Sequence, residues 1–160
     1  MTPLPADLRL LERAIALAGE ARARGRHPFG ALVADARGDV LAEAVNDSLP
    51  PGGDPTRHAE LLAAAAAARA APEGGLGGAT LFTSAEPCAM CAGAIYWTGI
   101  GRVVYALSES RLLALTGNHP ENPTLALPCR EVFARGQRVV EVLGPLLEDA
   151  AEAPHVGFWT

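Results

Sequence analysis

The pattern of hydrophobic and polar positions predicts a helix, two strands and then alternating helices and strands. Leu8, Leu11 and Ile15 recur at helical spacing within residues 6–24, which is typical of an amphipathic helix. The alanine-rich segment 58–71 favours a second helix, because alanine has the highest helix propensity. The remaining predicted elements are strands at 29–34, 40–45, 79–83, 103–107 and 138–143, and helices at 88–97, 108–115, 128–135 and 145–153.

The order of these predicted elements indicates an α/β fold. Alternation of helices and strands is typical of a three-layer α/β/α sandwich, in which helices cover both faces of a sheet. Residues 37–39, with the sequence Arg-Gly-Asp, are predicted to connect the first two strands as a hairpin. Segments 49–55 and 118–128 are rich in proline and are predicted to be loops.

The composition limits the class of protein. The chain has 160 residues, 49% of them hydrophobic, which suits one domain over residues 1–160 and excludes general disorder. No apolar run reaches the roughly 18 residues that a membrane-spanning helix needs. All 13 basic residues are arginine and the net charge is −5, so a nucleic-acid backbone is an unfavoured partner. The start of the chain lacks the pattern of a signal peptide, so we expect a cytoplasmic protein.

Two short motifs carry the candidate chemistry. His58 and Glu60 form an H-x-E motif at the predicted start of one helix, and Pro87, Cys88 and Cys91 form a P-C-x-x-C motif at the start of another. Two cysteines three positions apart share one face of a helix, and the helix dipole in the first turn favours the thiolate. One histidine and two thiolates make a three-ligand set for zinc, which leaves a fourth position open. Glu60 is then free to move protons.

These two motifs together are the signature of zinc-dependent nucleobase deaminases. The chain resembles the cytidine-deaminase-like zinc deaminase superfamily, and within it the branch of guanine deaminases and tRNA adenosine deaminases. The resemblance implies a central mixed five-stranded sheet and one catalytic Zn²⁺ per chain. It extends over about residues 22–107 and rests on five blocks in order: Pro28–Ala31, Asn46, Asp54–Glu60, Thr83–Cys91 and Gly93–Trp97.

The resemblance also implies roles for individual residues. Glu60 takes a proton from a zinc-activated water and delivers it to the substrate, so that ammonia leaves. Asn46 hydrogen-bonds the base, and Phe29 forms an apolar wall. The backbone of Ala59 donates to a ring acceptor, and the Ser84 carbonyl meets the departing amine.

Three further residues are candidate substrate contacts. Trp97 and Trp159 are expected to surround a flat heterocycle, although Trp97 also suits a core or an interface. Glu121, between two asparagines in the predicted loop, is a better candidate than Glu109 for reading the amidine edge of a base. The tail Phe158–Thr160 is expected to close the site as a lid, or else to pack in the core or at a dimer seam.

Alternative interpretations of the motifs remain. Cys129 could complete a closed Cys₃His structural zinc site, although a buried bystander thiol is the more common role of a free cysteine. The C-x-x-C pair alone also occurs in thiol redox motifs. A structural or regulatory zinc module without activity is the non-enzyme alternative.

The expected partner is a small-molecule base. Guanine is the leading substrate, with cytosine, an aminotriazine or a nucleoside as alternatives. Editing of tRNA adenosine is disfavoured because residues 141–152 contain four acidic side chains and no basic one. A homodimer is expected by analogy with the superfamily.

Overall fold

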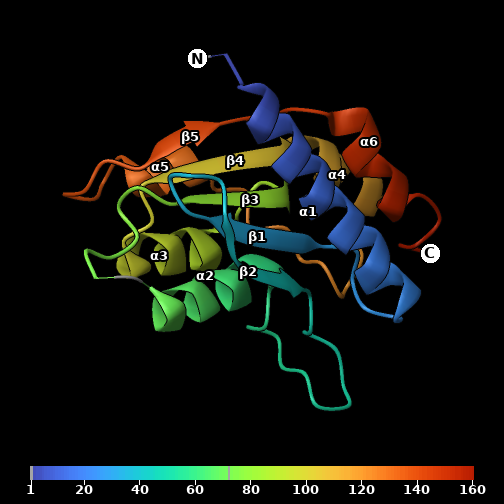
Figure 1. The fold of residues 1–160 in the computed structure, drawn as a ribbon. Helices are drawn as coiled ribbons and strands as arrows, with labels where there is room; N and C mark the ends of the chain where they lie inside the picture. Colours follow the sequence, from blue (N-terminus) through green and yellow to red (C-terminus); the bar gives the residue numbers. More distant parts are fainter. Residues whose placement is uncertain (1, 72) are drawn as a thin grey trace.

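The computed structural model describes residues 2–71 and 73–160. The chain folds as a five-stranded sheet covered by helices on both faces (Figure 1). The strands are β1 (Gly30–Ala34), β2 (Val40–Val45), β3 (Thr80–Ala85), β4 (Arg102–Leu107) and β5 (Glu141–Leu143). The helices are α1 (Pro5–Ala23), α2 (Ala59–Ala70), α3 (Ala89–Thr98), α4 (Glu109–Thr116), α5 (Cys129–Phe133), α6 (Glu148–Glu152) and the 3₁₀ turn η1 (Ala153–His155).

The sheet is mixed, as the sequence predicts. Its strand order is β2-β1-β3-β4-β5, with β1 antiparallel to both of its neighbours. Strands β3, β4 and β5 run parallel, and α3 makes the crossover connection between β3 and β4. Strands β1 and β3 are buried along their whole length, which is expected for strands covered by helices on both faces.

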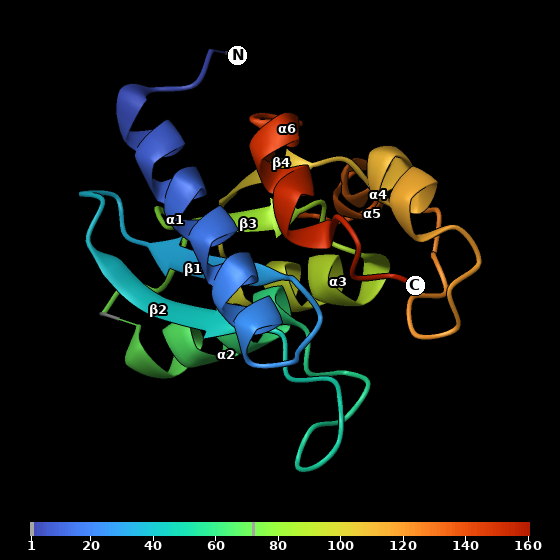
Figure 2. The same cartoon turned by 90° about the vertical axis from the view of Figure 1, so that its right-hand side faces the viewer.

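The core lies in two layers, one on each face of the sheet. Ala31 and Val33 of β1 pack with α2 and α3, whereas Leu32 and Ala34 pack with α1. This alternation follows from the two-residue period of a strand. Figure 2 shows α1 and α6 on one side of the sheet and α2 and α3 on the other. The α/β/α sandwich is therefore confirmed.

The connections to α2, α3 and α4 all leave the sheet at the same ends of its strands, which we call the functional edge. The start of β1 and the ends of β2, β3 and β4 lie together, because Gly30 pairs with Val45, Ala31 with Thr83, and Ala85 with Leu107. The segments that follow β2, β3 and β4 all leave the sheet there. Helix α3 starts soon after β3, α4 starts soon after β4, and the loop after β2 leads to the start of α2.

Three predicted elements near the C-terminus are clearly shorter in the structure. The helix expected at 128–135 is only Cys129–Phe133. The strand expected at 138–143 is only Glu141–Leu143, because Val139 is 90% exposed and pairing with β4 starts at Glu141. The helix expected at 145–153 begins only at Glu148. Pro145 lacks the backbone N–H, and Leu147 has a left-handed conformation with φ of 55°, so neither residue continues a helix.

None of the helices within residues 2–71 and 73–160 has the length and apolarity needed to cross a membrane. This agrees with the absence of a long apolar run in the sequence.

Candidate metal centre and active site

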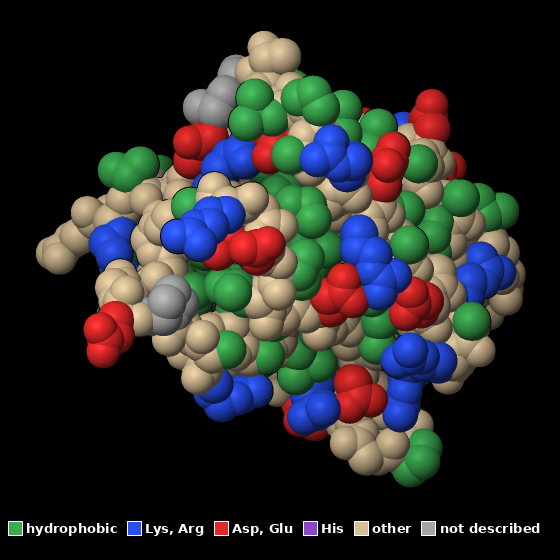
Figure 3. Space-filling view, in the orientation of Figure 1, with side chains coloured by type: hydrophobic (Ala, Val, Ile, Leu, Met, Phe, Trp, Pro, Cys, Tyr) green, Lys and Arg blue, Asp and Glu red, His purple; other side chains and the backbone are tan. Residues whose placement is uncertain are grey.

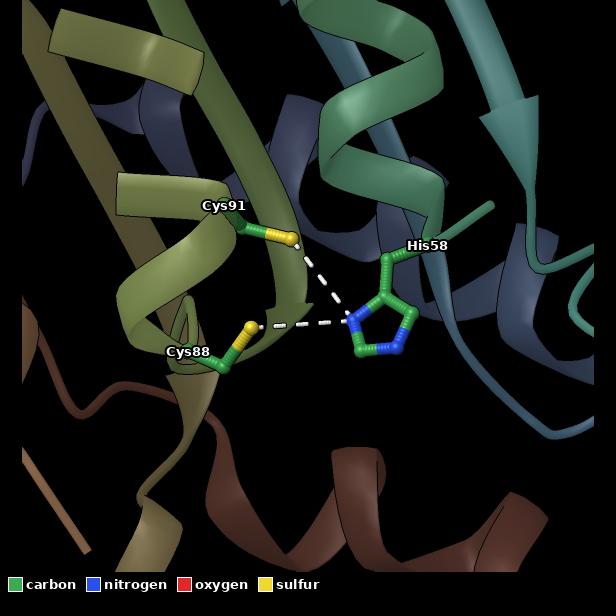
Figure 4. A group of neighbouring side chains, drawn as sticks. All are labelled: His58, Cys88 and Cys91. Carbon is green, nitrogen blue, oxygen red and sulfur yellow. Dashed lines mark hydrogen bonds between the residues drawn. The ribbon is translucent and has the colours of Figure 1, made fainter. Parts of the chain in front are cut away.

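His58, Cys88 and Cys91 converge at the functional edge of the sheet. His58 is the N-cap residue of α2, Cys88 is the N-cap residue of α3, and Cys91 lies in the first turn of α3. Figure 4 shows the imidazole Nδ1 facing both sulfur atoms. The distances from Nδ1 are 3.6 Å to Cys88 Sγ and 3.7 Å to Cys91 Sγ. The three candidate ligands therefore share one small site.

These distances fit a tetrahedral zinc ion. Ligands at about 2.1 Å for an imidazole nitrogen and about 2.3 Å for a thiolate, at a tetrahedral angle, lie about 3.6 Å apart. All three ligand atoms lie within 4.8 Å of one another. One nitrogen and two sulfurs are also a donor set that zinc prefers. Because the chain supplies three ligands here, one tetrahedral position has no protein ligand, as in catalytic zinc sites.

The electrostatics of the site couple cation binding to the release of protons. The hydrogen bond from Cys91, followed by the contact with His58, lowers the pKa of Cys88 to about 4. The pKa of the Cys91 thiol is raised by its hydrogen bond to Cys88 and by burial. The hydrogen bond with Cys88 raises the pKa of His58. A cation that binds both sulfurs must displace the remaining protons, so occupancy is coupled to pH.

Glu60 lies beside the ligands in the first turn of α2. Its side chain is buried, and its Oε1 accepts a hydrogen bond of 3.2 Å from the Thr83 hydroxyl. Its Oε2 lies 3.7 Å from Cys91 Sγ. Burial raises the pKa of this carboxyl above its usual range.

A cavity of about 590 Å³ opens onto this site. It reaches His58, Cys88 and Glu60, and its walls come mainly from the loops after β2 and after α4. Three of the predicted substrate contacts, Phe29, Asn46 and Glu121, line it.

Other predicted contacts have different surroundings. Ser84 and Ala59 are buried beside the site without lining the cavity, and the Ser84 hydroxyl accepts a hydrogen bond from the Gly30 backbone. Trp159 packs behind Phe29, which lines the cavity, and their ring centroids are 6.1 Å apart. Trp97 is 78% exposed at the end of α3 and is not brought to the cavity, because that end of the helix points away from the metal ligands. Its expected role around the heterocycle finds no support in this cavity and stays a prediction.

Cys129 takes no part in the ligand group. Within the part of the chain that the structure describes, the group of metal-ligating side chains comprises His58, Cys88 and Cys91 only. Cys129 begins α5 and is fully buried, and burial raises the pKa of its thiol to about 12. The closed Cys₃His site is therefore not formed.

Two acidic residues that line the cavity, Glu86 and Glu109, are not among the predicted substrate contacts. Glu86 follows β3, and its two carboxylate oxygens accept hydrogen bonds of 3.2 Å from the backbone amides of Glu109 and Cys129. Glu109 lines the cavity, and the Thr124 hydroxyl is its neighbouring side-chain donor. The sequence signal for the place of Glu109 in the cavity is its position soon after β4, at the same edge of the sheet as the H-x-E motif.

The comparisons with known proteins agree with this geometry. Residues 5–107 match the model of the family described as the cytidine and deoxycytidylate deaminase zinc-binding region. A probable cytosine deaminase of Schizosaccharomyces pombe is 41% identical over 96% of this chain and 92% of its own length. A tRNA-specific adenosine deaminase of Haemophilus influenzae is 36% identical over 68% of this chain and 62% of its own length.

A solved guanine deaminase from Nitrosomonas europaea has the same fold. It superposes with a TM-score of 0.77 and 28% identity, over 99% of this chain and 86% of its own. The fold, the ligand group and the family match point to the same conclusion. The chain belongs to the cytidine and deoxycytidylate deaminase family, and it is a zinc-dependent hydrolase that acts on C–N bonds of nucleobases or nucleosides.

Proposed function

We propose that the protein releases ammonia from a free nucleobase, with guanine as its leading substrate. The observation that carries this proposal is Glu109, a partly buried acidic residue that lines the cavity and has only the Thr124 hydroxyl as a neighbouring side-chain donor. Burial, followed by the charges of Glu86, Cys88 and Glu60, raises the pKa of Glu109 to about 7. When it is ionised, this carboxylate can accept hydrogen bonds from N–H groups of a bound ligand.

Guanine offers more donors next to its reacting carbon than cytosine does. In guanine the amino-bearing carbon lies beside a ring N–H, so two neighbouring N–H groups can donate to one carboxylate. In cytosine the ring nitrogen beside the amino-bearing carbon carries no hydrogen. A cavity with such a carboxylate is therefore better matched to guanine, because an unpaired buried acceptor costs free energy.

Asn46 is suited to bind an acceptor atom of the base. Its Oδ1 accepts hydrogen bonds from the Ser48 backbone amide at 3.0 Å and the Ser48 hydroxyl at 2.8 Å. No described residue accepts a hydrogen bond from its Nδ2, so this amide nitrogen is the group that it can offer to a ligand. A carbonyl oxygen or an unprotonated ring nitrogen is the matching partner.

The proton chemistry is assigned to Glu60. A bound zinc ion supplies Lewis-acid activation of a water molecule as the nucleophile. The Glu60 carboxylate accepts a proton at the oxygen that faces the cavity and returns it to the leaving amino group. Thr83 holds the other oxygen, so the carboxylate keeps one orientation during both transfers.

Charge around the cavity disfavours an RNA substrate. Glu60, Glu86, Glu109 and Glu121 all line it, and carboxylates repel phosphate. The acidic stretch near the C-terminus is a weaker argument than the sequence suggests, because Arg111 pairs with residues of α6 and Arg102 pairs with β5. Figure 3 shows arginine and acidic side chains interspersed over the face that it presents.

Cytosine is the second candidate. The similarity to the probable cytosine deaminase of Schizosaccharomyces pombe extends over 92% of that protein and so includes the region after β4 that lines the cavity. An aminotriazine also combines an amino-bearing carbon with ring acceptors. Nucleosides and tRNA adenosine are the remaining alternatives.

The cellular compartment and the oligomeric state of the enzyme are also proposals. Three free thiols, two of them in the ligand group, suit the reducing environment of the cytoplasm. A homodimer is supported by the exposed side chains of Trp97 and Val139, because large apolar side chains at the surface often mark contacts between subunits.

A panel of substrates tests the proposed function. Ammonia release by the zinc-loaded protein is measured with guanine, cytosine, an aminotriazine, guanosine, cytidine and an anticodon stem-loop. We expect the highest kcat/KM with guanine, because its paired N–H groups match the carboxylate of Glu109. Preference for the stem-loop would overturn the free-base proposal, and preference for cytosine would select the second candidate.

The Glu60→Gln variant tests the proton role. Glutamine keeps the size of the side chain but cannot carry the proton, so ammonia release should fall by about 10²- to 10⁴-fold. Zinc content, measured by metal analysis, should stay at one per chain because Glu60 is outside the ligand group. The matched control is Cys129→Ala, which should retain both zinc and turnover. Turnover in Glu60→Gln near the control's rate would remove Glu60 from the reaction.

The Glu109→Gln variant tests the recognition role. Loss of a charged acceptor should raise KM for guanine by about 10- to 100-fold and change kcat much less. Protonation of Glu109 as the pH falls through about 7 removes the same acceptor, so kcat/KM of the unmodified enzyme should decrease below that pH. The variant should lack this limb of the pH profile. An identical limb in the variant would assign it to another group and exclude Glu109 from recognition.

A further inference from the structure

A chain of hydrogen bonds connects Asn46 to the loop on the opposite side of the cavity. The Ser48 hydroxyl lies 2.8 Å from Asn46 Oδ1 and 3.3 Å from His27 Nδ1. The other ring nitrogen of His27, Nε2, lies 2.8 Å from Glu121 Oε2. The four residues come from the segment before β1, the loop after β2 and the loop after α4, and all of them line the cavity.

Two members of this chain are shielded from water. His27 is 5% exposed and Asn46 is 2% exposed, whereas Ser48 is half-buried and the side chain of Glu121 is 51% exposed. The C-terminal tail covers the histidine, with ring centroids 5.1 Å away for Trp159 and 5.9 Å away for Phe158. Figure 2 shows the C-terminus on the side of the molecule that carries the loop after α4, and Trp159 also contacts His119 of that loop. We call the hydrogen-bonded chain of Asn46, Ser48, His27 and Glu121 the relay. The C-terminal tail therefore packs over the relay and does not form a separate flap.

The donors and acceptors in this chain have a fixed direction. Asn46 Oδ1 can only accept, so the Ser48 hydroxyl donates to it. The Ser48 oxygen must then accept from His27 Nδ1–H. Glu121 is held as a carboxylate, since its hydrogen bond with His27 lowers its pKa, and it accepts from His27 Nε2–H. All three bonds form together only when both ring nitrogens of His27 carry a proton.

A neutral His27 breaks the chain at one point. With a single N–H, the ring keeps either its bond to Glu121 or its donation to Ser48. If it keeps Glu121, His27 Nδ1 becomes a second acceptor that competes with Asn46 Oδ1 for the single Ser48 hydroxyl hydrogen. When that hydrogen goes to His27, Asn46 Oδ1 retains only the Ser48 backbone amide. The position and freedom of the Asn46 amide therefore depend on His27.

We propose that His27, Ser48 and Glu121 are positioning residues that hold the Asn46 amide with its Nδ2 available to the substrate. This inference rests on the proposed function, in which Asn46 binds the base. It gives Glu121 a different role from that of a direct reader of the amidine edge: its carboxylate pairs with His27 and so keeps the relay complete. The relay also gives the C-terminal aromatic residues a function, because they exclude water from its central imidazole.

The charged and titratable groups around His27 come from the loops that line the cavity and from the C-terminal tail. Glu121 is the acidic group in direct contact with the ring. On the side of the tail, His155 contacts Trp159, and burial lowers the pKa of His155 to about 4. The positive charge on this side is Arg22, whose guanidinium lies 5.9 Å from the Phe158 ring centroid. The ring of His119 also lies against the ring of Trp159. Arg26, the preceding residue, is paired with Asp47.

Ser48 variants give the sharpest kinetic test. Ser48→Ala removes the hydroxyl and keeps the backbone donor, so KM for the preferred base should rise about fivefold to tenfold while kcat stays within about twofold. Ser48→Thr keeps a hydroxyl and is the matched control, which should restore the original KM. Unchanged KM in Ser48→Ala, or an equal defect in Ser48→Thr, would overturn the relay.

A double-mutant cycle tests whether the residues act as one chain. His27→Phe keeps an aromatic ring under Trp159 and removes both ring nitrogens. Its KM effect should match that of Ser48→Ala, and the double variant should be no worse than either single variant, because each change already breaks the same chain. Multiplicative effects on KM would show that the two residues act independently and would contradict the proposal.

Two further readouts separate this proposal from the proposed function. The side-chain amide signal of Asn46 in ¹H–¹⁵N NMR spectra of the zinc-loaded protein is identified by its loss in Asn46→Asp. It should shift in both His27→Phe and Ser48→Ala but stay close to its original position in Ser48→Thr, whatever the substrate is. An unmoved signal overturns the relay. Conversely, a shifted signal with unchanged KM in Asn46→Ala would leave the relay intact and refute the role of Asn46 in binding the base.

Discussion

The positions of two helix starts at one edge of the sheet are the constraint on which the rest of the site depends. Antiparallel pairing of β1 with β2 and β3 brings the end of β2 and the end of β3 to the same edge. The chain then begins α2 at His58 and α3 at Cys88 within a few ångströms of each other. Side chains at an N-cap and in a first turn are fixed by the helix, so the three ligand atoms need little further support.

The same edge explains why chemistry and recognition are divided between different parts of the chain. The ligands and Glu60 lie on helices that are packed against the sheet, which holds them rigidly. The walls of the cavity come from loops, including those that carry Asn46 and Glu121. This arrangement allows the substrate to change through the loops while the zinc chemistry is conserved within the fold.

Most of the fold and the centre of the site could be predicted from the sequence, because they depend on local patterns. The period of hydrophobic positions indicates the main helices and strands, and the three-residue spacing of Cys88 and Cys91 already places both sulfurs on one helical face. What could not be predicted depends on long-range packing. Glu109 has no motif of its own, and it becomes notable only because β4 ends beside the metal ligands.

The hydrogen-bond relay and the surface pairs illustrate the same limit. His27 and Glu121 are 94 positions apart, and nothing in their local sequence indicates that they touch. Arg111 neutralises part of the acidic C-terminal stretch from a different helix, so a count of charges along the chain overstated its effect. Trp97 was placed near the heterocycle by its neighbours in the sequence, whereas the direction of α3 takes its side chain to the surface.

X-ray absorption spectroscopy at the zinc edge tests the central claim most directly, because it reports the ligand set of the zinc-loaded protein in solution. The account predicts two sulfur scatterers at about 2.3 Å and one imidazole nitrogen at about 2.1 Å, with a fourth light atom that the chain does not supply. Three sulfur scatterers would instead indicate a site closed by Cys129. That result would contradict the open, catalytic zinc centre from which the activity is inferred.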